Sequence, residues 1–200
     1  MFALGVVLAA GAGQRMGRPK ALVETADGTS WLAAALGVLR ASGCDQVAAV
    51  IGAAAEQVRA LPLPPGVDLV TAPTWELGIG ESLHAALDHA ETTEARQLIL
   101  HLVDTPDVTA DVVTRVLTAT LPDQDHGLAR AWFNGAPGHP VVLGRAHWAA
   151  VRAATGGPRG AGPWLAGQQV RAVECGDLAS GWDVDDPAGL ATWTLKGGHS

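Results

Sequence analysis

Apolar runs alternate with amphipathic stretches along most of this 200-residue chain. The runs are short and continuous, which is typical of strands buried on both faces of a sheet, and the stretches between them repeat apolar residues with helical spacing. The predicted strands are 6–8, 46–51, 67–70, 97–103, 128–133, 139–143 and 169–174, and the predicted helices are 30–41, 53–59, 81–90, 110–119, 145–154, 163–166 and one that begins at Pro187 behind its cap Asp186. This alternation indicates an α/β fold of the Rossmann-like, doubly wound type with a mainly parallel sheet.

The C-terminal half departs from the parallel pattern. From residue 127 onward, the strands 128–133 and 139–143 are separated only by the turn-forming segment 134–138. A connection this short joins antiparallel strands, so we expect an antiparallel portion in this half of the sheet. The length and the 48% hydrophobic content favour a single domain over residues 1–200.

Composition excludes several classes of protein. The formal net charge is −7, with 13 Lys and Arg against 20 Asp and Glu, which argues against a nucleic-acid backbone as partner. No apolar run approaches the ~18 residues of a membrane span. Cys44 and Cys175 are too few and too far apart for a disulfide framework, so we expect reduced thiols and a cytoplasmic location.

The segment 8–20 carries the strongest chemical signal. It follows a buried strand, and ligands of open α/β sheets bind at the carboxyl ends of strands. We expect positive φ at Gly11 and Gly13, with free backbone N–H groups that donate to phosphate oxygens. Arg15, Arg18 and Lys20 add three cations in an acidic chain. The segment therefore predicts a site for an anionic small molecule such as a nucleoside triphosphate.

Two other phosphate-binding loops fit the segment less well. A dinucleotide-binding fingerprint needs its third glycine at position 16, where the chain has Met16, and an acidic residue at the end of the second strand, where it has Ile51 and Gly52. A Walker loop needs Gly-Lys-Ser or Gly-Lys-Thr at its end. The remaining alternative is an ordinary strand-to-helix turn with surface arginines.

Leu8-Ala-Ala-Gly-x-x-x-Arg-Met-Gly-x-Pro-Lys20 resembles the signature of the nucleotidyltransferases that complete molybdenum cofactors, in particular the cytidylyltransferase branch. Further segments resemble the family's motifs in the family's order: Trp75-x-x-Gly78 to Ser82-Leu83, Asp104-Thr-Pro106, Gly138-His-Pro140, Gly157-x-Arg-Gly160 and Asp183-x-Asp-x-Pro187. Two segments depart from it. Thr105 replaces the usual Gln after the aspartate. The segment 160–163 matches the family's version less closely, so the pocket for the second substrate is expected to differ.

The resemblance implies a nucleotide-diphospho-sugar transferase-like fold and a Mg²⁺-dependent reaction. It assigns nucleotide binding to Leu8, Ala9, Ala10, Gly11, Gly13, Lys20, Gly78, Gly80 and Ser82; catalysis to Lys20, Arg15 and Asp104; metal binding to Asp104, Asp183 and Asp185; and acceptor binding to His139 and Arg159. The spacing of Asp104 agrees with this assignment, since it follows the strand 97–103. Its alternative is to cap the next helix, for which Asp107 and Thr109 are better candidates.

The implied reaction moves CMP from CTP to the phosphate of molybdopterin and releases pyrophosphate. A recipient molybdoenzyme or its chaperone is the further expected partner. Ala10 favours CTP, because the guanylyl branch typically has Gly there. The alternatives are a transferase of the same fold that uses GTP or another phosphorylated acceptor, an NAD(P)H-dependent reductase of the nicotine-blue type, and a binding module with a vestigial site.

Overall fold

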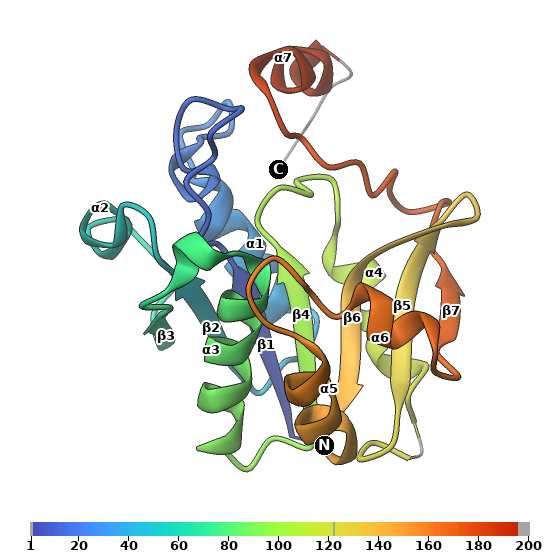
Figure 1. The fold of residues 1–200 in the computed structure, drawn as a ribbon. Coiled ribbons are helices and arrows are strands. Elements are labelled where there is room, and N and C mark those ends of the chain that lie inside the picture. The colour runs from blue at the N-terminus through green and yellow to red at the C-terminus, as the bar shows by residue number, and fades with distance from the viewer. Residues whose placement is uncertain (1, 122, 196–200) are drawn as a thin grey trace.

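A computed structural model describes residues 2–121 and 123–195 (Figure 1). Within these ranges the strands form one seven-stranded sheet in the order β3-β2-β1-β4-β6-β5-β7. The strands are β1 (Ala3–Leu8), β2 (Gln46–Ile51), β3 (Val67–Thr71), β4 (Gln97–Leu102), β5 (Leu128–Phe133), β6 (Ala136–Gly144) and β7 (Arg171–Glu174). Strand β6 is antiparallel to both of its neighbours, and the remaining pairs are parallel, which confirms the mainly parallel sheet with an antiparallel portion.

Helices cover both faces of this sheet. They are α1 (Trp31–Ala41), α2 (Ala55–Arg59), α3 (Ile79–Glu91), α4 (Ala110–Thr118), α5 (Trp148–Ala154), α6 (Gly162–Ala166) and α7 (Pro187–Leu195), with short 3-10 turns η1 (Lys20–Leu22), η2 (Trp75–Leu77) and η3 (Arg145–His147). Helix α1 packs with α4 on one face, and α3 packs with α5 on the other. Helix α1 begins where the sequence predicts, because the Ser30 hydroxyl accepts a hydrogen bond from the Ala33 amide at 3.1 Å.

Strand β1 lies inside the sheet, between β2 and β4, and is buried along its whole length. Its alternate side chains enter two separate cores, as strand geometry requires. Val7 joins Leu36 of α1 in one core, and Val6 joins Leu87 of α3 in the other. The chain leaves β1 toward β2 and later returns on the opposite side as β4, so the strand order reverses between β1 and β4. A ligand site is expected at the carboxyl ends of these two strands.

The C-terminal segment crosses these strand ends. After β7 the chain passes over the carboxyl edge of the sheet and finishes in α7 at the top of Figure 1. Trp193 of α7 packs edge to face against Trp31 of α1, with 5.9 Å between ring centroids. Asp186 caps α7 as predicted, because its Oδ1 accepts from the Gly189 amide at 2.7 Å. Residues far apart in sequence are thereby held at one edge of the sheet.

Several predicted boundaries were wrong. The strand predicted at 6–8 begins at Ala3, and the strand predicted at 169–174 begins at Arg171. The helix predicted at 81–90 begins at Ile79, and the first turn of the helix predicted at 145–154 is the 3-10 turn η3.

Two further boundaries differ for local backbone reasons. The helix predicted at 53–59 begins at Ala55, because Ala54 adopts a left-handed conformation with φ 54°. The strand predicted at 139–143 begins at Ala136, because Asn134 and Gly135 alone make the turn, with φ of 53° and 84°. Two successive residues with positive φ are typical of a tight β-hairpin turn.

The described helices include none with both the length and the apolar character needed to cross a bilayer. Cys44 and Cys175 are free and buried, in agreement with the expected absence of a disulfide framework.

Candidate active site

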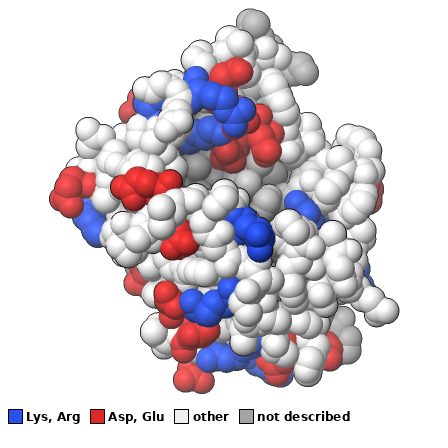
Figure 2. Space-filling view, viewed as in Figure 1, with Lys and Arg blue, Asp and Glu red and all other residues white. Residues whose placement is uncertain are grey.

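A cavity of about 460 Å³ lies at the reversal point of the strand order. In Figure 2 a hollow near the upper centre is bordered by basic and acidic side chains that face each other. The cavity is lined by Leu8, Ala9, Ala10, Gly11, Ala12, Gly13, Gln14, Arg15 and Lys20 from the segment after β1, by Leu102, Val103 and Asp104 after β4, by Trp75, Glu76, Gly78, Ile79 and Ser82 around the start of α3, and by Asp185.

The segment after β1 folds back on itself, and Gly13 makes this path possible. Gly13 has φ 62°, and a Cβ atom there would lie 1.9 Å from the carbonyl oxygen of Arg18. Gly17 also has positive φ, at 75°. The prediction of positive φ was therefore right for Gly13 and wrong for Gly11, whose backbone is not left-handed. Gly11 is exposed, and a Cβ there would meet nothing within 4 Å, so its small size leaves room for a ligand.

The backbone of this segment presents donors to the cavity. In the described part of the chain, no protein acceptor is found for the amide N–H groups of residues 11–15. The strand before them is anchored, because the Ala9 amide donates to the Val50 carbonyl at 2.9 Å. Successive free amides at the end of a buried strand form a cradle for anionic oxygens.

Lys20 forms ion pairs across the cavity with two aspartates. Its Nζ lies 2.6 Å from Oδ2 of Asp104 and 2.5 Å from Oδ1 of Asp185. Arg15 reaches the other oxygen of Asp185 at 2.9 Å. Burial alone would lower the pKa of Lys20, but the hydrogen bonds to Asp104 and Asp185 outweigh it and raise the pKa above its ordinary value. The Lys20 side chain is thus a cation at neutral pH.

The C-terminal segment brings its aspartates to Asp104 through backbone contacts. The Val184 amide donates to the Asp104 carbonyl at 2.9 Å. Asp183 and Asp185 are the chain neighbours of Val184, so this hydrogen bond brings both of them near Asp104. Asp107 fixes the same segment, since one of its carboxylate oxygens accepts from the amide and the hydroxyl of Ser180 at 2.7 and 2.5 Å. Asp107 therefore holds the C-terminal segment through Ser180 and does not cap α4. Thr109 occupies the N-cap position of α4, without a side-chain hydrogen bond to the helix.

The three aspartates form an electronegative cluster around the lysine. Desolvation, followed by the charges of Asp104 and Asp185, raises the pKa of Asp183. The hydrogen bond from Lys20 instead lowers the pKa of Asp185. Oδ1 of Asp104 is buried and accepts no hydrogen bond from the described chain. An unsatisfied buried carboxylate oxygen is costly, and a cation such as Mg²⁺ or Mn²⁺ satisfies it well.

This arrangement is not a ready metal cage. Among the described residues, no group of three or more His, Cys, Asp or Glu side chains is close enough together to hold a metal ion. The ammonium of Lys20 lies between two of the carboxylates that the resemblance assigns to a metal. The donor chemistry still fits a divalent cation, because Asp104 offers one buried oxygen that Lys20 does not use.

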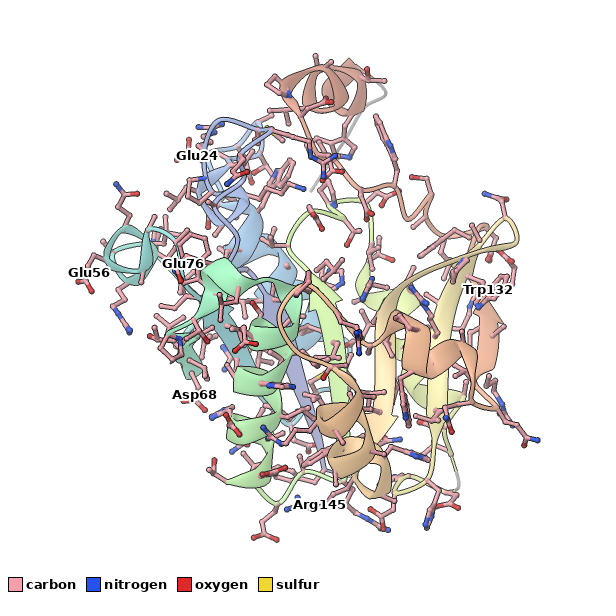
Figure 3. The ribbon with its side chains drawn as sticks, viewed as in Figure 1. Glu24, Glu56, Asp68, Glu76, Trp132 and Arg145 are labelled. Carbon is pink, nitrogen blue, oxygen red and sulfur yellow. The ribbon has the colours of Figure 1, made fainter. Side chains whose placement is uncertain are left out.

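The opposite wall begins at η2 and α3, whose Glu76 is labelled in Figure 3. Gly78 and Ser82 line the cavity as predicted for nucleotide-binding residues, and Ser82 is 4% exposed. Gly80 does not line it. A Cβ at Gly80 would lie 2.6 Å from the backbone of Gly156, and its amide donates to the Gly157 carbonyl at 2.9 Å. This glycine lets α3 pack against the turn at 156–159.

Glu81 completes that packing and was not identified from the sequence. One of its carboxylate oxygens accepts from the Gly157 amide at 2.9 Å and the other from the Thr74 hydroxyl at 2.8 Å. Those hydrogen bonds lower the pKa of Glu81. An acidic residue in the first turn of a helix is so common that sequence alone does not distinguish this one.

The predicted acceptor residues lie outside the main cavity. His139 lines a second, smaller cavity beside it. Arg159 is exposed in the turn that it forms with Gly156, and it lines neither cavity. Thr105, which replaces the Gln of the resembled motif, is 3% exposed and donates to the Leu102 carbonyl at 3.2 Å. Its side chain is therefore structural and does not line the main cavity.

Comparisons with known proteins agree with this geometry. Residues 5–173 match the family model described as the MobA-like NTP transferase domain. A nicotine blue oxidoreductase from Paenarthrobacter nicotinovorans is 33% identical over 192 residues, covering 90% of this chain and 91% of that protein. A probable molybdenum cofactor guanylyltransferase from Rhodopirellula baltica is 36% identical over 109 residues, covering 54% of this chain and 51% of that protein.

Solved structures share the whole fold. A homologue of Mycobacterium tuberculosis Rv0371c from Mycobacterium sp. strain JC1 has a TM-score of 0.80 and 25% sequence identity, covering 97% of this chain and 96% of that one. The Mycobacterium tuberculosis protein, solved as a complex with manganese, has a TM-score of 0.73 and 26% identity, covering 96% of this chain and 97% of that one.

Proposed function

Because the chain belongs to the MobA-like NTP transferase family and is a nucleotidyltransferase, we propose that it transfers CMP from CTP to the phosphate of molybdopterin, with Mg²⁺ as cofactor and pyrophosphate as the second product. The observation that carries the proposal is the meeting of Lys20, Asp104 and Asp185 beside the backbone amides of residues 11–15. Cations and free amides bind the triphosphate, and carboxylates bind its metal.

The residues supply what this transfer needs. Two anionic substrates must be held together, so positioning and charge neutralisation contribute more than covalent catalysis. Lys20 and Arg15 stabilise charge on the α-phosphate and on the departing pyrophosphate. Asp104, with Asp183 or Asp185, would hold the Mg²⁺, which when bound neutralises phosphate charge and orients the triphosphate. The manganese in the Mycobacterium tuberculosis structure supports a divalent cation in this fold.

The choice of CTP over GTP rests on Ala10, which lines the cavity. The Ala10 side chain is 2% exposed, and its carbonyl accepts from the Ala53 amide at 2.9 Å, which fixes the backbone there. Ala10 also belongs to the buried core. The guanylyl branch of the resembled family typically has Gly there, and this difference is what favours CTP over GTP.

The proposal that molybdopterin is the acceptor rests on the sequence motifs and on the name of the Rhodopirellula baltica relative. A molybdoenzyme or its chaperone would then receive the product. Buried, reduced cysteines agree with a cytoplasmic location.

Pyrophosphate release tests the proposal directly. The protein is assayed with CTP, GTP, UTP or ATP, each with and without molybdopterin and Mg²⁺. We expect release only when CTP, molybdopterin and the metal are all present. Release with GTP alone would reassign the nucleotide, and release with another phosphorylated acceptor, such as a sugar phosphate, would reassign the acceptor. Molybdopterin binding without turnover, retained in Lys20→Ala, would indicate a binding module.

A second candidate is an NAD(P)H-dependent reductase. The match to the nicotine blue oxidoreductase favours it, because that match covers nine-tenths of both chains. A reductase has no evident use for the buried, unpaired oxygen of Asp104, whereas a metal-dependent transferase does. Stabilisation by NADPH in the absence of metal, together with unchanged activity in Asp104→Ala, would favour the reductase.

A further inference from the structure

A second cavity of about 180 Å³ opens beside the main one. Leu8, Ile79 and Leu102 line both cavities, so these side chains form their common boundary. The remaining lining is mostly aliphatic, with two polar side chains, Arg130 and His139. A ligand held in the main cavity can therefore extend past Leu102 into a pocket with a different chemical character.

Arg130 is the unusual member of this lining. It lies on β5, half-buried, and its Nε donates to the Gly138 carbonyl at 2.8 Å. No carboxylate of the described chain forms an ion pair with it, and burial lowers the pKa of its guanidinium. A partly desolvated cation without a counter-charge is costly, so a ligand oxygen is its natural partner.

His139 adds a neutral polar group next to that cation. Burial, with the nearby charge of Arg130, lowers the pKa of His139 to about 3. Its imidazole is therefore uncharged at neutral pH and can donate or accept one hydrogen bond per ring nitrogen. The pocket thus combines a cationic fork and a neutral imidazole with aliphatic walls, which suits a flat ring with a carbonyl or anionic oxygen on its edge.

The opposite rim of the pocket is backbone with little side chain. Gly160, Ala161 and Gly162 line it, in the segment where the sequence is looser than the resembled motif. Small residues leave room for a planar ligand to lie against the chain. The neighbouring Arg159, which the resemblance assigned to the acceptor, lines neither cavity, whereas Arg130 lines this one.

We propose that the Arg130 cavity is the acceptor subsite, which takes a planar heterocycle with a carbonyl or oxyanion edge while the acceptor's phosphate stays in the main cavity near Lys20. The inference rests on the proposed transferase function and names the residue that recognises the acceptor's ring. Arg130 binds the ring oxygen through its terminal N–H groups, and the apolar walls contributed by Leu8 and Leu102 hold the ring faces.

The test uses the full chain and free pterin as probe, with no nucleotide present. Pterin binding is measured by calorimetry for the wild type, Arg130→Gln and the control Arg40→Gln, which removes an exposed charge at the end of α1. Loss of a charged hydrogen bond is expected to weaken pterin binding about 10- to 100-fold in Arg130→Gln. Arg40→Gln is expected to bind as the wild type does.

A kinetic arm separates the subsite from the nucleotide site. In pyrophosphate release, Arg130→Gln should raise the KM for molybdopterin by about the same factor and leave the KM for CTP unchanged. Equal pterin binding by wild type and Arg130→Gln would overturn the proposal, and so would the absence of pterin binding by the wild type. Inhibition of pyrophosphate release by inorganic phosphate but not by pterin would overturn it as well.

Two safeguards keep the result interpretable. If Arg130→Gln fails to fold, Ala161→Leu fills the same cavity from its opposite rim and should weaken pterin binding in the same way. If the wild type releases no pyrophosphate with any nucleotide, the transferase proposal fails, while the pterin measurement still decides whether this cavity binds a planar ring.

Discussion

The ammonium nitrogen of Lys20 lies 2.6 Å from Asp104, although the two residues are 84 positions apart in the chain. The first belongs to the segment after β1 and the second to the segment after β4, the two strands between which the sheet order reverses. The contact therefore links the two walls of the nucleotide cavity. It also defines which side chains must separate or rearrange when a triphosphate and its metal bind.

Replacing Lys20 with alanine should affect turnover more than nucleotide affinity. The lost ammonium would no longer stabilise charge that develops in the transition state, which typically lowers kcat about 10²- to 10³-fold. Steady-state pyrophosphate release at saturating CTP measures the effect. Arg40→Ala serves as the control for loss of an exposed cation. A kcat within a factor of two of wild type (roughly the scatter of such assays) would remove Lys20 from the catalytic group.

Asp104→Asn should weaken the binding of a divalent metal. The substitution keeps the size of the side chain, removes its negative charge and replaces one of the two carboxylate oxygens by an amide group, which is a much poorer metal ligand. Binding of Mn²⁺ in the presence of CTP, followed by electron paramagnetic resonance, should fall by about tenfold or more, as expected for loss of a carboxylate ligand. Removal of metal with EDTA should abolish turnover of the wild type. Equal Mn²⁺ affinity in Asp104→Asn would contradict the assignment.

Gly80→Ala should destabilise the wall of the cavity. The added methyl would lie 2.6 Å from the backbone of Gly156, and backbone moves less readily than a side chain. Overpacking of this kind costs about 1–3 kcal/mol, which thermal denaturation detects as a lower Tm. Gly37→Ala in α1 is the matched control: nothing lies within 4 Å of its Cβ position, so that variant should be as stable as wild type or more stable by up to ~1 kcal/mol.

Stability should fall as the pH is lowered from neutral, in part because of His101. This side chain is 1% exposed, and burial lowers its pKa from 6.5 to about 4. The unfolded chain takes up a proton first, so the stabilising contribution is complete above pH 6.5 and is lost as the pH falls toward 4. A shift of this size corresponds to at most about 3 kcal/mol.

Thermal denaturation of His101→Leu across this pH range checks the effect. The fall in Tm between pH 7 and pH 4.5 (approximate limits around the two pKa values) should be smaller in this variant than in wild type. Identical pH profiles for wild type and His101→Leu would show that His101 does not contribute.

The fold was predictable because its signals are local. Buried apolar strands, the Ser30 cap of α1 and the Asp186 cap of α7 can all be identified from neighbouring residues. The loop after β1 was likewise recognisable from its glycines and cations. Ala54 shows the limit, since nothing about an alanine signals a left-handed backbone.

The parts of the site that escaped prediction depend on tertiary contacts. Gly80 packs against the backbone of Gly156, a residue on a distant turn, and no local sequence signal announces that contact. Asp107 was one of two candidates, with Thr109, for the cap of α4, and it instead binds Ser180, 73 positions away. Arg130 lies on β5 between β6 and β7, and only the tertiary structure reveals that its cation lacks a carboxylate partner among the described residues.

The C-terminal segment that carries Asp185 is expected to dock late in folding. Lys20 and Asp185 are separated by 165 positions, so their ion pair closes a loop that includes nearly every strand of the sheet. Contacts over such separations form after local structure, because the entropy of loop closure must first be offset. A folding intermediate with a formed sheet and an undocked C-terminal segment would therefore leave Lys20 paired with Asp104 alone and Arg15 without its partner Asp185. Docking of residues 176–195 adds Asp185 to both cations, so the charge arrangement of the cavity is completed in the last step of folding.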